Sequence, residues 1–343
     1  MHKYEDKKIL FALLAVALVA GFSGTIFESV KTQLAQVHTL GEASVIEATK
    51  NLAPTTPIPP EITLGFVGDI MLDRGVEYQV QKNLDGDFSK LFANASFLKE
   101  PDIMFGNLEG PISDKGSDAH NLYSFRMDPR VAPVLRDAGF DVVSFANNHV
   151  GDWKRPAFED TLARLSSAGI LACGAGMNKQ EASEPAIINE NGFTVGFLCF
   201  SDVGPTGMAA TDTQSGILLA SDPNFAGIVR TAANKVNALI VSFHFGEEYK
   251  TAHTARQQEL AHRAIDNGAV FVVGAHPHVG QDSEIYKTVP IFYSLGNFVF
   301  DQNFSKDTQT GLFVSAILNG TNVSNTLVHK IRFDKNFAPS LVE

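Results

Sequence analysis

The chain has 343 residues, 44% of them hydrophobic, and a formal net charge of −11. This length allows one large domain or two smaller ones, and the hydrophobic content argues against a disordered chain. Residues 1–60 hold equal numbers of acidic and basic residues, so the acidic excess lies in residues 61–343. Because nucleic-acid phosphates need a basic face, we expect no nucleic-acid partner. A polyanionic substrate would be attracted only locally, for instance by bound metal.

The first patterned segment is an uncharged apolar stretch from Ile9 to Phe27, preceded by Lys7 and Lys8. As a helix with ~1.5 Å per residue it would span about 28 Å, close to the thickness of a bilayer core. A cleaved signal peptide is the alternative, but no A-x-A site follows the apolar centre. We therefore expect residues 1–27 to be a single-pass membrane anchor. The basic residues before it predict that the rest of the chain lies outside the cytoplasm.

Residues 28–60 have the composition of a tether. They end in APTTPIPP, in which four prolines fall within seven residues. Such a run favours stiff, extended backbone and cannot form a helix or a central strand. We therefore expect one folded domain over residues 61–343.

Within that domain, short apolar runs alternate with helical patterns. The predicted strands cover residues 62–67, 102–105, 141–145, 194–200, 238–243, 269–273, 290–295 and 312–318. The predicted helices run from Asp128-Pro129, as N-cap and first-turn proline, to Gly139, from Pro156 to Ala168, and from Ala252 to Asn267. This alternation predicts a layered α/β domain.

Polar residues follow six of the predicted strands at the point where each strand ends. The segments are GD at 68–69, GNLE at 106–109, ANNH at 146–149, HFGEE at 244–248, GAHPH at 274–278 and GN at 296–297, with Asp301 just beyond. Strands of α/β folds bring their carboxyl ends together at one edge, where ligands bind. Each segment alone could be a turn cap, a left-handed Asn or a buried histidine. Six such ends together favour a shared site.

The chemistry of this set suits a divalent metal ion. Imidazole, carboxylate and amide groups without thiolates are ligands typical of Zn, Mn or Fe. Pro277 restricts the backbone between His276 and His278, which lowers the cost of ordering both rings. A polar loop that happens to hold two histidines is the alternative. We expect both histidines to be ligands of one or two divalent ions.

The chain has two cysteines, Cys173 and Cys199, and neither has a C-x-x-C neighbour. A thiolate zinc site or thioredoxin chemistry is therefore not expected. Both lie in apolar sequence, where buried free thiols are the simplest expectation. A disulfide between them is the alternative.

Six motifs, in order, resemble those of the CapA family of bacterial capsule (poly-γ-glutamate) synthesis proteins. They are GFVGDIML, FGNLEGPI, DVVSFANNHVGD, HFGEEY, VVGAHPHVGQ and YSLGNFVFDQ, and the likeness covers about residues 61–305. A membrane anchor followed by an outside domain also matches this family. The family is in turn similar to calcineurin-like metallophosphoesterases. The resemblance therefore implies two mixed β-sheets sandwiched between helices.

The resemblance also implies a role for each matched residue. Asp69 would be the first metal carboxylate, and Glu109 would stand where a bridging carboxylate is expected. The remaining metal ligands would be Asn148, preferred to Asn147, and His244, His276 and His278. His149 would be the catalytic acid beside them. Residues that orient ligands or contact substrate would be Glu248, Asn297 and Asp301, and Arg126 is nominated to bind a substrate carboxylate or phosphate.

Two departures from the metallophosphoesterase pattern stand out. Asp69 is followed by Ile70 and Met71, so the histidine of the D-x-H motif is missing. The G-D-x-x-D motif is replaced by N-L-E at 107–109. Both changes match the CapA branch, but they weaken the expectation of a standard two-metal phosphatase site.

The implied function is capsule or poly-γ-glutamate biosynthesis by a membrane-anchored protein with an extracytoplasmic, metal-dependent hydrolase-like domain. Its substrate would be an anionic polymer or a phosphoester, and its partners would be membrane subunits of the synthesis machinery. The alternative is a non-catalytic subunit of a synthesis and export complex that grips polymer carboxylates through its metal. A structural domain that binds no metal is a third reading, disfavoured by the intact set of ligands.

Overall fold

The computed structural model describes residues 31–33, 35 and 61–342, and the fold lies within the compact unit Pro59–Glu343. The strands are β1 (Glu61–Ile70), β2 (Ile103–Leu108), β3 (Val142–Ser144), β4 (Leu171–Cys173), β5 (Ala175–Gly176), β6 (Ala186–Glu190), β7 (Phe193–Ser201), β8 (Gly216–Ile217), β9 (Ala238–His244), β10 (Ala269–Ala275), β11 (Ser283–Tyr286), β12 (Val289–Phe292), β13 (Asn297–Val299), β14 (Thr310–Asn319), β15 (Asn322–Phe333) and β16 (Pro339–Leu341). The helices are α3 (Arg74–Asn83), α4 (Val131–Ala138), α5 (Lys154–Ala168), α6 (Lys179–Ser183), α7 (Phe225–Ala233) and α8 (Ala255–Asp266), and three 3₁₀ turns cover Phe88–Phe92, Ser96–Lys99 and Thr206–Met208.

Most of the expected anchor and linker lies outside these described residues. The apolar stretch 9–27 is not among them, and only four residues of the segment 28–60 are. Across residues 31–33, 35 and 61–342, no helix combines the length and apolar character needed to span a bilayer.

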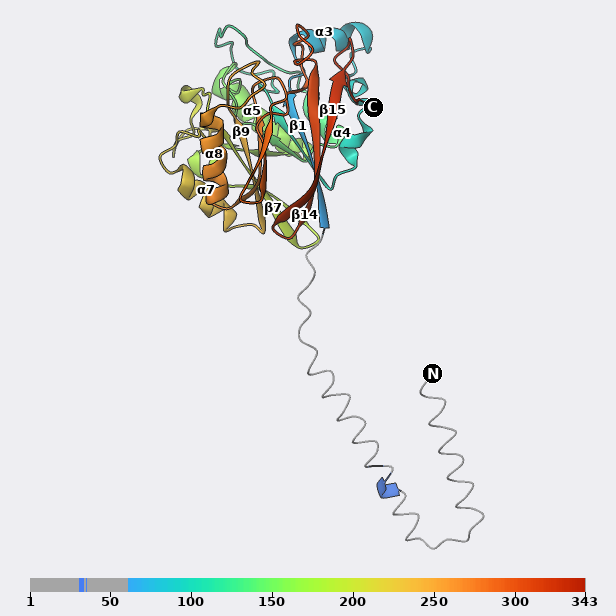
Figure 1. The fold of residues 1–343 in the computed structure, drawn as a ribbon. Helices are drawn as coiled ribbons and strands as arrows, with labels where there is room; N and C mark the ends of the chain where they lie inside the picture. The colour runs from blue at the N-terminus through green and yellow to red at the C-terminus, as the bar shows by residue number, and fades with distance from the viewer. Residues whose placement is uncertain (1–30, 34, 36–60, 343) are drawn as a thin grey trace, which may run out of the picture. The chain divides into compact units, whose positions relative to one another are not determined.

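Two mixed β-sheets form the centre of the fold (Figure 1). The first has the order β16-β15-β14-β1-β2-β3-β4, and β13 pairs with β1 beside this path. Its β1–β4 and β13 are parallel, whereas β14, β15 and β16 pair antiparallel. The second has the order β11-β12-β10-β9-β7-β6, with a parallel centre and antiparallel strands at both edges.

The two sheets pack face to face through aromatic side chains. Phe66 of β1 stacks on Phe271 of β10 with ring centroids 4.6 Å apart. Phe105 of β2 stacks on Phe197 of β7 at 5.5 Å. All four rings are buried, and burying rings of this size is a major contribution to folding free energy.

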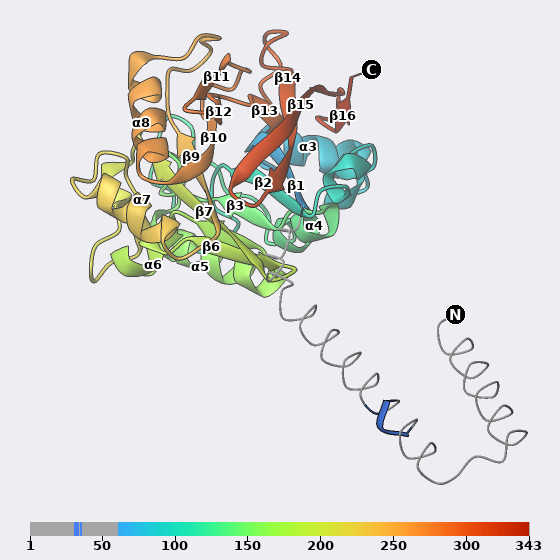
Figure 2. The same cartoon turned by 60° about the horizontal axis from the view of Figure 1, so that its bottom comes forward.

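Helices cover the outer face of each sheet. Apolar side chains of α4 and α5 belong to the same buried cluster as the first sheet. Those of α7 and α8 form a second cluster with β7, β9 and β10. In Figure 2, α7 and α8 lie on one side of the molecule and β14, β15 and α3 on the other. The expected α/β architecture of two mixed sheets flanked by helices is confirmed.

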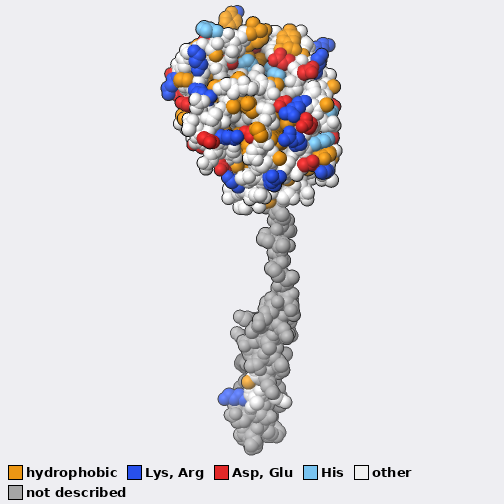
Figure 3. All heavy atoms as spheres, turned by 90° about the vertical axis from the view of Figure 1, so that its left-hand side faces the viewer, with side chains coloured by type: hydrophobic (Ala, Val, Ile, Leu, Met, Phe, Trp, Pro, Cys, Tyr) orange, Lys and Arg blue, Asp and Glu red, His pale blue; other side chains and the backbone are white. Residues whose placement is uncertain are grey.

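The exposed side of the α8 layer carries charges of both signs. Figure 3 shows acidic and basic side chains interspersed over that face. Arg256 of α8 pairs with Asp202 at 3.0 Å, and Lys287 pairs with Asp266 at 2.8 Å. Neighbouring charges therefore neutralise each other along this face.

All eight predicted strands are present, and the three predicted helices end where expected, but their predicted starts need correction. Asp128 is not the N-cap of α4, because its carboxylate accepts a hydrogen bond from Arg130 N in a preceding turn and the helix begins at Val131. Helix α8 begins at Ala255, because Thr254 and Gln257 form a reciprocal capping box there. Strand β15 was not predicted, because its sequence is largely polar and its side chains are mostly exposed.

The two cysteines form a disulfide, which corrects the expectation of free thiols. Cys173 ends β4 of the first sheet and Cys199 lies in β7 of the second, with Cα atoms 5.4 Å apart. A Cβ on the adjacent Gly174 would lie 2.2 Å from the carbonyl oxygen of Cys199, so only glycine permits this approach. The bond therefore joins the two sheets, a contact that apolar sequence around each cysteine does not reveal.

Candidate metal centre

The carboxyl ends of strands from both sheets meet at one edge of the sandwich. Asp69 of β1 pairs in register with Asn107 of β2 on one side and with Asn297 of β13 on the other. In the second sheet, His244 of β9 pairs with Ala275, the residue before His276. This register brings together side chains that are far apart in sequence, as the strand-end argument predicts.

Five of the predicted ligands form two overlapping groups of potential metal-binding atoms. One group is Glu109, His244 and His276, and the other is Asp69, Glu109 and His278. Within each group the ligand atoms lie within 4.8 Å of one another. Glu109 belongs to both groups, which is the position of a carboxylate that could bridge two ions.

Glu109 is the clearest sign that a cation belongs here. Its side chain is fully buried, and neither carboxylate oxygen accepts a hydrogen bond. Burial raises the pKa of Glu109 to about 7. A buried carboxylate without donors is costly, and a divalent ion would remove that cost. The donor set therefore fits a metal centre.

Asp69 is held ready as a second carboxylate. Its Oδ1 accepts a hydrogen bond of 2.7 Å from the Asn107 amide, and its Oδ2 lies 3.2 Å from His278 Nδ1. Burial raises the pKa of Asp69, but the hydrogen bond and charge of His278 outweigh it, so the pKa is lowered overall. Asp69 is therefore ionised at neutral pH.

The histidines differ in their protonation. Burial lowers the pKa of His244 to about 3, and burial with neighbouring histidine charges also lowers that of His276. Burial disfavours charge on His278 too, but Glu109 and Asp69 outweigh it and raise its pKa to about 9. His276 Nδ1 is buried without a hydrogen-bond partner. His244 and His276 are thus neutral and able to bind metal, whereas His278 must first lose a proton.

The backbone of the histidine turn is strained on both sides of Pro277. His276 has φ of 102° and His278 has φ of 59°, a region that residues other than glycine seldom adopt. Such conformations cost of order 1–3 kcal/mol each and concentrate at ligand-binding sites. Pro277 alone therefore does not account for the placement of the two rings, because the surrounding structure must also hold His276 and His278 in these strained conformations.

The neighbouring asparagines have different environments. Asn148 Oδ1 lies 2.7 Å from His244 Nε2, at the edge of the first ligand group. Asn147 is buried, and its side chain stabilises the loop: it donates a hydrogen bond to Leu108 O and accepts one from His149 N. Of the two asparagines, Asn148 is the one whose side chain contacts a predicted ligand.

His149 lies beside the ligands and is fixed by two contacts. Its Nδ1 is 2.8 Å from Asp152 Oδ2, and its ring stacks on Phe125 with centroids 3.9 Å apart. It directly follows Asn148, whose side chain contacts His244. Asp152, almost fully buried, was missed from the sequence, although the spacing His-x-x-Asp in NHVGD is a usable signal.

Asn107 was also missed as a functional candidate. Its amide nitrogen contacts Asp69 Oδ1 at 2.7 Å and His244 Nδ1 at 3.3 Å, so it links the two ligand groups. Its side-chain oxygen is buried without a hydrogen-bond partner. The sequence signal for Asn107 was its place in GNLE, one of the polar segments that follow a predicted strand.

The other nominated residues fall at different distances from the centre. Asn297 Oδ1 lies 2.9 Å from His278 Nδ1 and orients that ring. Glu248 is exposed on the loop after β9. Asp301 instead forms a two-pronged ion pair with Arg74, at 3.0 and 2.5 Å. The Arg126 guanidinium lies over the Trp153 ring, 3.5 Å from its centroid.

The residue in place of the missing histidine is part of an apolar cluster. Met71 is fully buried against Phe125 and Phe300. The position of the missing histidine is therefore occupied by a packed apolar side chain, Met71, and not by another metal ligand.

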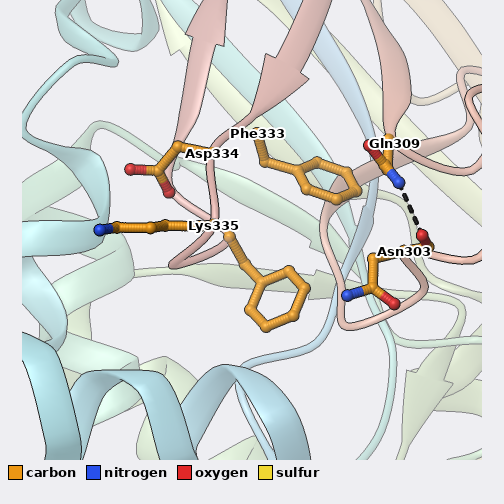
Figure 4. Close-up of a pocket in the computed structure, with 6 residues that line it drawn as sticks. Asn303, Gln309, Phe333, Asp334 and Lys335 are labelled. Carbon is orange, nitrogen blue, oxygen red and sulfur yellow. Dashed lines mark hydrogen bonds between the residues drawn. The ribbon is translucent and has the colours of Figure 1, made fainter.

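A separate small cavity of about 230 Å³ is shown in Figure 4. It is lined by Asn303, Gln309, Phe333, Asp334, Lys335 and Phe337, and Gln309 Nε2 donates to Asn303 O across one side. It contains none of the predicted site residues.

The chain is similar to proteins of one known family. The family model "Bacterial capsule synthesis protein PGA_cap" matches residues 63–302. A PGA biosynthesis protein CapA of Bacillus subtilis is 33% identical over 73% of this chain and 66% of its own length. A capsule biosynthesis protein CapA of Bacillus anthracis is 34% identical over 79% of this chain and 67% of its own. The chain thus spans about two thirds of the length of these relatives.

Among solved structures, a hypothetical protein of Thermus thermophilus shares the fold. It superposes with a TM-score of 0.50 at 15% identity, covering 78% of this chain and 98% of that one. At this identity the likeness concerns the fold alone.

Proposed function

The chain belongs to the family of bacterial capsule synthesis proteins, and from that premise we propose that it acts in the biosynthesis of capsular poly-γ-glutamate. In this proposal the folded domain is a metallophosphoesterase-like, metal-dependent hydrolase. Its substrate is an anionic polymer or a phosphoester, and its partners are membrane subunits of the synthesis machinery. The names of the relatives support a role in this pathway, and the residues of the candidate metal centre support a hydrolase activity.

One observation carries the metal-dependent activity: Glu109 is buried, lacks hydrogen-bond donors and is shared by two ligand groups. A divalent ion held there, such as Mn, Zn or Fe, would supply positive charge that stabilises negative charge on substrate oxygens. The proposed ligands are Asp69, Glu109, Asn148, His244, His276 and His278. No other polar cluster among residues 61–342 combines this burial with unpartnered carboxylate oxygens.

His149 is proposed as the proton donor to the leaving group. Asp152 engages its Nδ1, which leaves Nε2 for proton transfer. Phe125 covers one ring face and prevents the imidazole from turning. These two contacts support the assignment of His149 as the general acid.

The proposed location is the outer face of the cell membrane. Residues 1–27 would be the anchor, residues 28–60 the linker and residues 61–343 the functional domain. The disulfide between Cys173 and Cys199 supports this location, since disulfides persist mainly outside the cytoplasm.

The test combines metal analysis, hydrolysis and polymer production. Full-length protein purified in detergent should retain at least one divalent ion per chain by elemental analysis. It should hydrolyse phosphoesters or γ-linked glutamate, and Asp69→Ala should abolish both this activity and polymer production in cells. A chain with far less than one ion, prepared without chelators, would remove the metal proposal.

A second function is favoured by Met71, which fills the place of an expected ligand with an apolar side chain. In that version the protein is a non-catalytic subunit that grips polymer carboxylates through its metal. Asp69→Ala would still abolish polymer production, but no hydrolysis would be detected with any substrate.

A further inference from the structure

We propose that Tyr249 and Phe304 form an aromatic platform that binds the chain of a γ-linked glutamate polymer next to the metal centre. This inference rests on the proposed function and names where its polymer is held. The two residues lie on different loops, one after β9 and the other after β13. Their rings meet edge to face with centroids 5.2 Å apart.

The platform is exposed and touches the metal centre. Tyr249 is 44% exposed and Phe304 is 65% exposed, although the fold buries most of its phenylalanines. The ring of Tyr249 also stacks over His278 with centroids 6.1 Å apart. An apolar surface thus continues outward from a metal-binding side chain.

Tyr249 is held in place before any ligand binds. Its backbone has φ of 62°, a strained conformation, and its N–H donates to Pro277 O at 2.8 Å. Its hydroxyl accepts a hydrogen bond from Gln302, whose side-chain oxygen accepts one from Asn297. The ring is therefore tied to both the histidine turn and the residue that orients His278. Strain held in this way is typical of ligand-binding positions.

The loop that carries Phe304 is anchored at both ends. Asp301 is paired with Arg74, and Thr308 is buried and accepts a hydrogen bond from Asn297 through its carbonyl. An exposed phenylalanine on an anchored loop loses little conformational freedom on binding, which favours affinity.

The chemistry of the two parts indicates the ligand. A γ-linked glutamate unit has two methylene groups and a planar amide along its backbone and one carboxylate beside it. The metal centre supplies the attraction for the carboxylate, and the rings can pack against methylenes and amide planes. The platform itself carries no charge, so its contribution does not require a cation on this acidic domain. An extended polymer can contact the two rings and the metal centre at once, whereas a small anion contacts only the metal centre.

The test measures binding of a γ-linked glutamate decamer to the metal-loaded, full-length protein by calorimetry. Tyr249→Ala and Phe304→Ala should each weaken decamer binding about 3- to 10-fold, the range for one aromatic contact. Tyr249→Phe keeps the ring but loses the hydrogen bond from Gln302, so it should lose less affinity than Tyr249→Ala. Tyr78→Ala, at another exposed tyrosine on α3, is the matched control and should have no effect. The loss should persist in 0.5 M salt, because an apolar contact is not screened.

Two further measurements, inorganic-phosphate binding and metal content, distinguish an effect on the platform from an effect on the metal centre. Both should be unchanged in the Ala variants, and a loss of metal would show a structural role and overturn the proposal. Wild-type affinity for the decamer in both variants would also overturn it. Binding of a neutral oligosaccharide that depends on the two rings would assign the platform to a different polymer and reject this one. If the wild type fails to bind the decamer, the platform proposal fails, whereas the proposed function is judged separately by polymer production in Asp69→Ala cells.

Discussion

Asp69 and Asn297 are direct partners in the parallel pairing of β1 with β13, and both place an oxygen beside Nδ1 of His278. The distances are 3.2 Å from Asp69 Oδ2 and 2.9 Å from Asn297 Oδ1. The short strand β13 thus contributes to the metal centre without supplying a proposed ligand. Its role is to orient the ring that Asp69 also contacts.

Asn297→Ala should lower metal affinity about 10- to 100-fold, because it removes a partner that orients His278. His278→Ala should cost more, since it removes the proposed ligand itself. Competition titration with a metal-sensitive dye measures both. Asn94→Ala, at an exposed position, is the control and should bind metal as wild type. Equal affinity of Asn297→Ala and wild type would show that His278 is oriented by other contacts.

His149→Asn separates an enzyme from a binding subunit. If the protein is a hydrolase, the substitution should lower the turnover rate by a factor of about 100 to 10,000 with metal content near normal. Asp152→Asn should lower the rate in the same direction, because Nδ1 of His149 loses the carboxylate that holds the ring. If the protein only grips polymer, His149→Asn should leave polymer production largely intact. Loss of metal in His149→Asn would instead make His149 a ligand.

Metal affinity should rise with pH. In the metal-free protein the pKa of His278 is raised to about 9 and that of Glu109 to about 7, and each must lose its proton to bind an ion. Between pH 7 and 9 the affinity should increase about tenfold per pH unit, more steeply below pH 7, and level off above 9. Titrations in buffers of different ionisation enthalpy would reveal the released proton. An affinity independent of pH between 7 and 9 would contradict a protonated His278.

The stability of the metal-free protein should show the opposite trend. Above pH 6.5 an unfolded histidine is neutral, whereas folded His278 keeps its proton up to about pH 9. The folded state then binds more protons, so the free energy of unfolding should fall as pH rises from 7 to 9. Urea denaturation of chelator-treated protein measures this, and His278→Gln should flatten the trend.

Loss of the disulfide should lower the free energy of unfolding by about 3 kcal/mol, because the bond closes a loop between residues separated by 26 positions. Urea denaturation of Cys173→Ala/Cys199→Ala measures the change. Wild-type protein reduced while unfolded should show a similar loss, and reductant should not affect the double variant. Equal stability of oxidised and reduced wild type would contradict a stabilising bond.

The sequence by itself determined the α/β class, eight of the strands and the clustering of polar residues at strand ends. These follow from local patterns: apolar runs of strand length, helix ends marked by glycine, and polar side chains directly after buried strands. The strand-end segments that hold Asp69, Glu109, His244, His276 and His278 could be selected because the ends of parallel strands meet at one edge regardless of loop details. The ligand roles of Asp69, Glu109 and His244 came from the resemblance to the CapA family.

Only the tertiary structure decided how those residues share contacts. Glu109 belongs to two ligand groups, Asn107 links Asp69 to His244, and Asp152 fixes His149, because sheet register and packing place these atoms within a few ångströms. Asp301 followed a strand end as the ligands do, yet it pairs with Arg74 on a neighbouring helix. The pairing of Cys173 with Cys199 likewise depends on the distance between two sheets. Sequence patterns report local backbone and burial, whereas distances between side chains on different strands exist only once the sheets have packed.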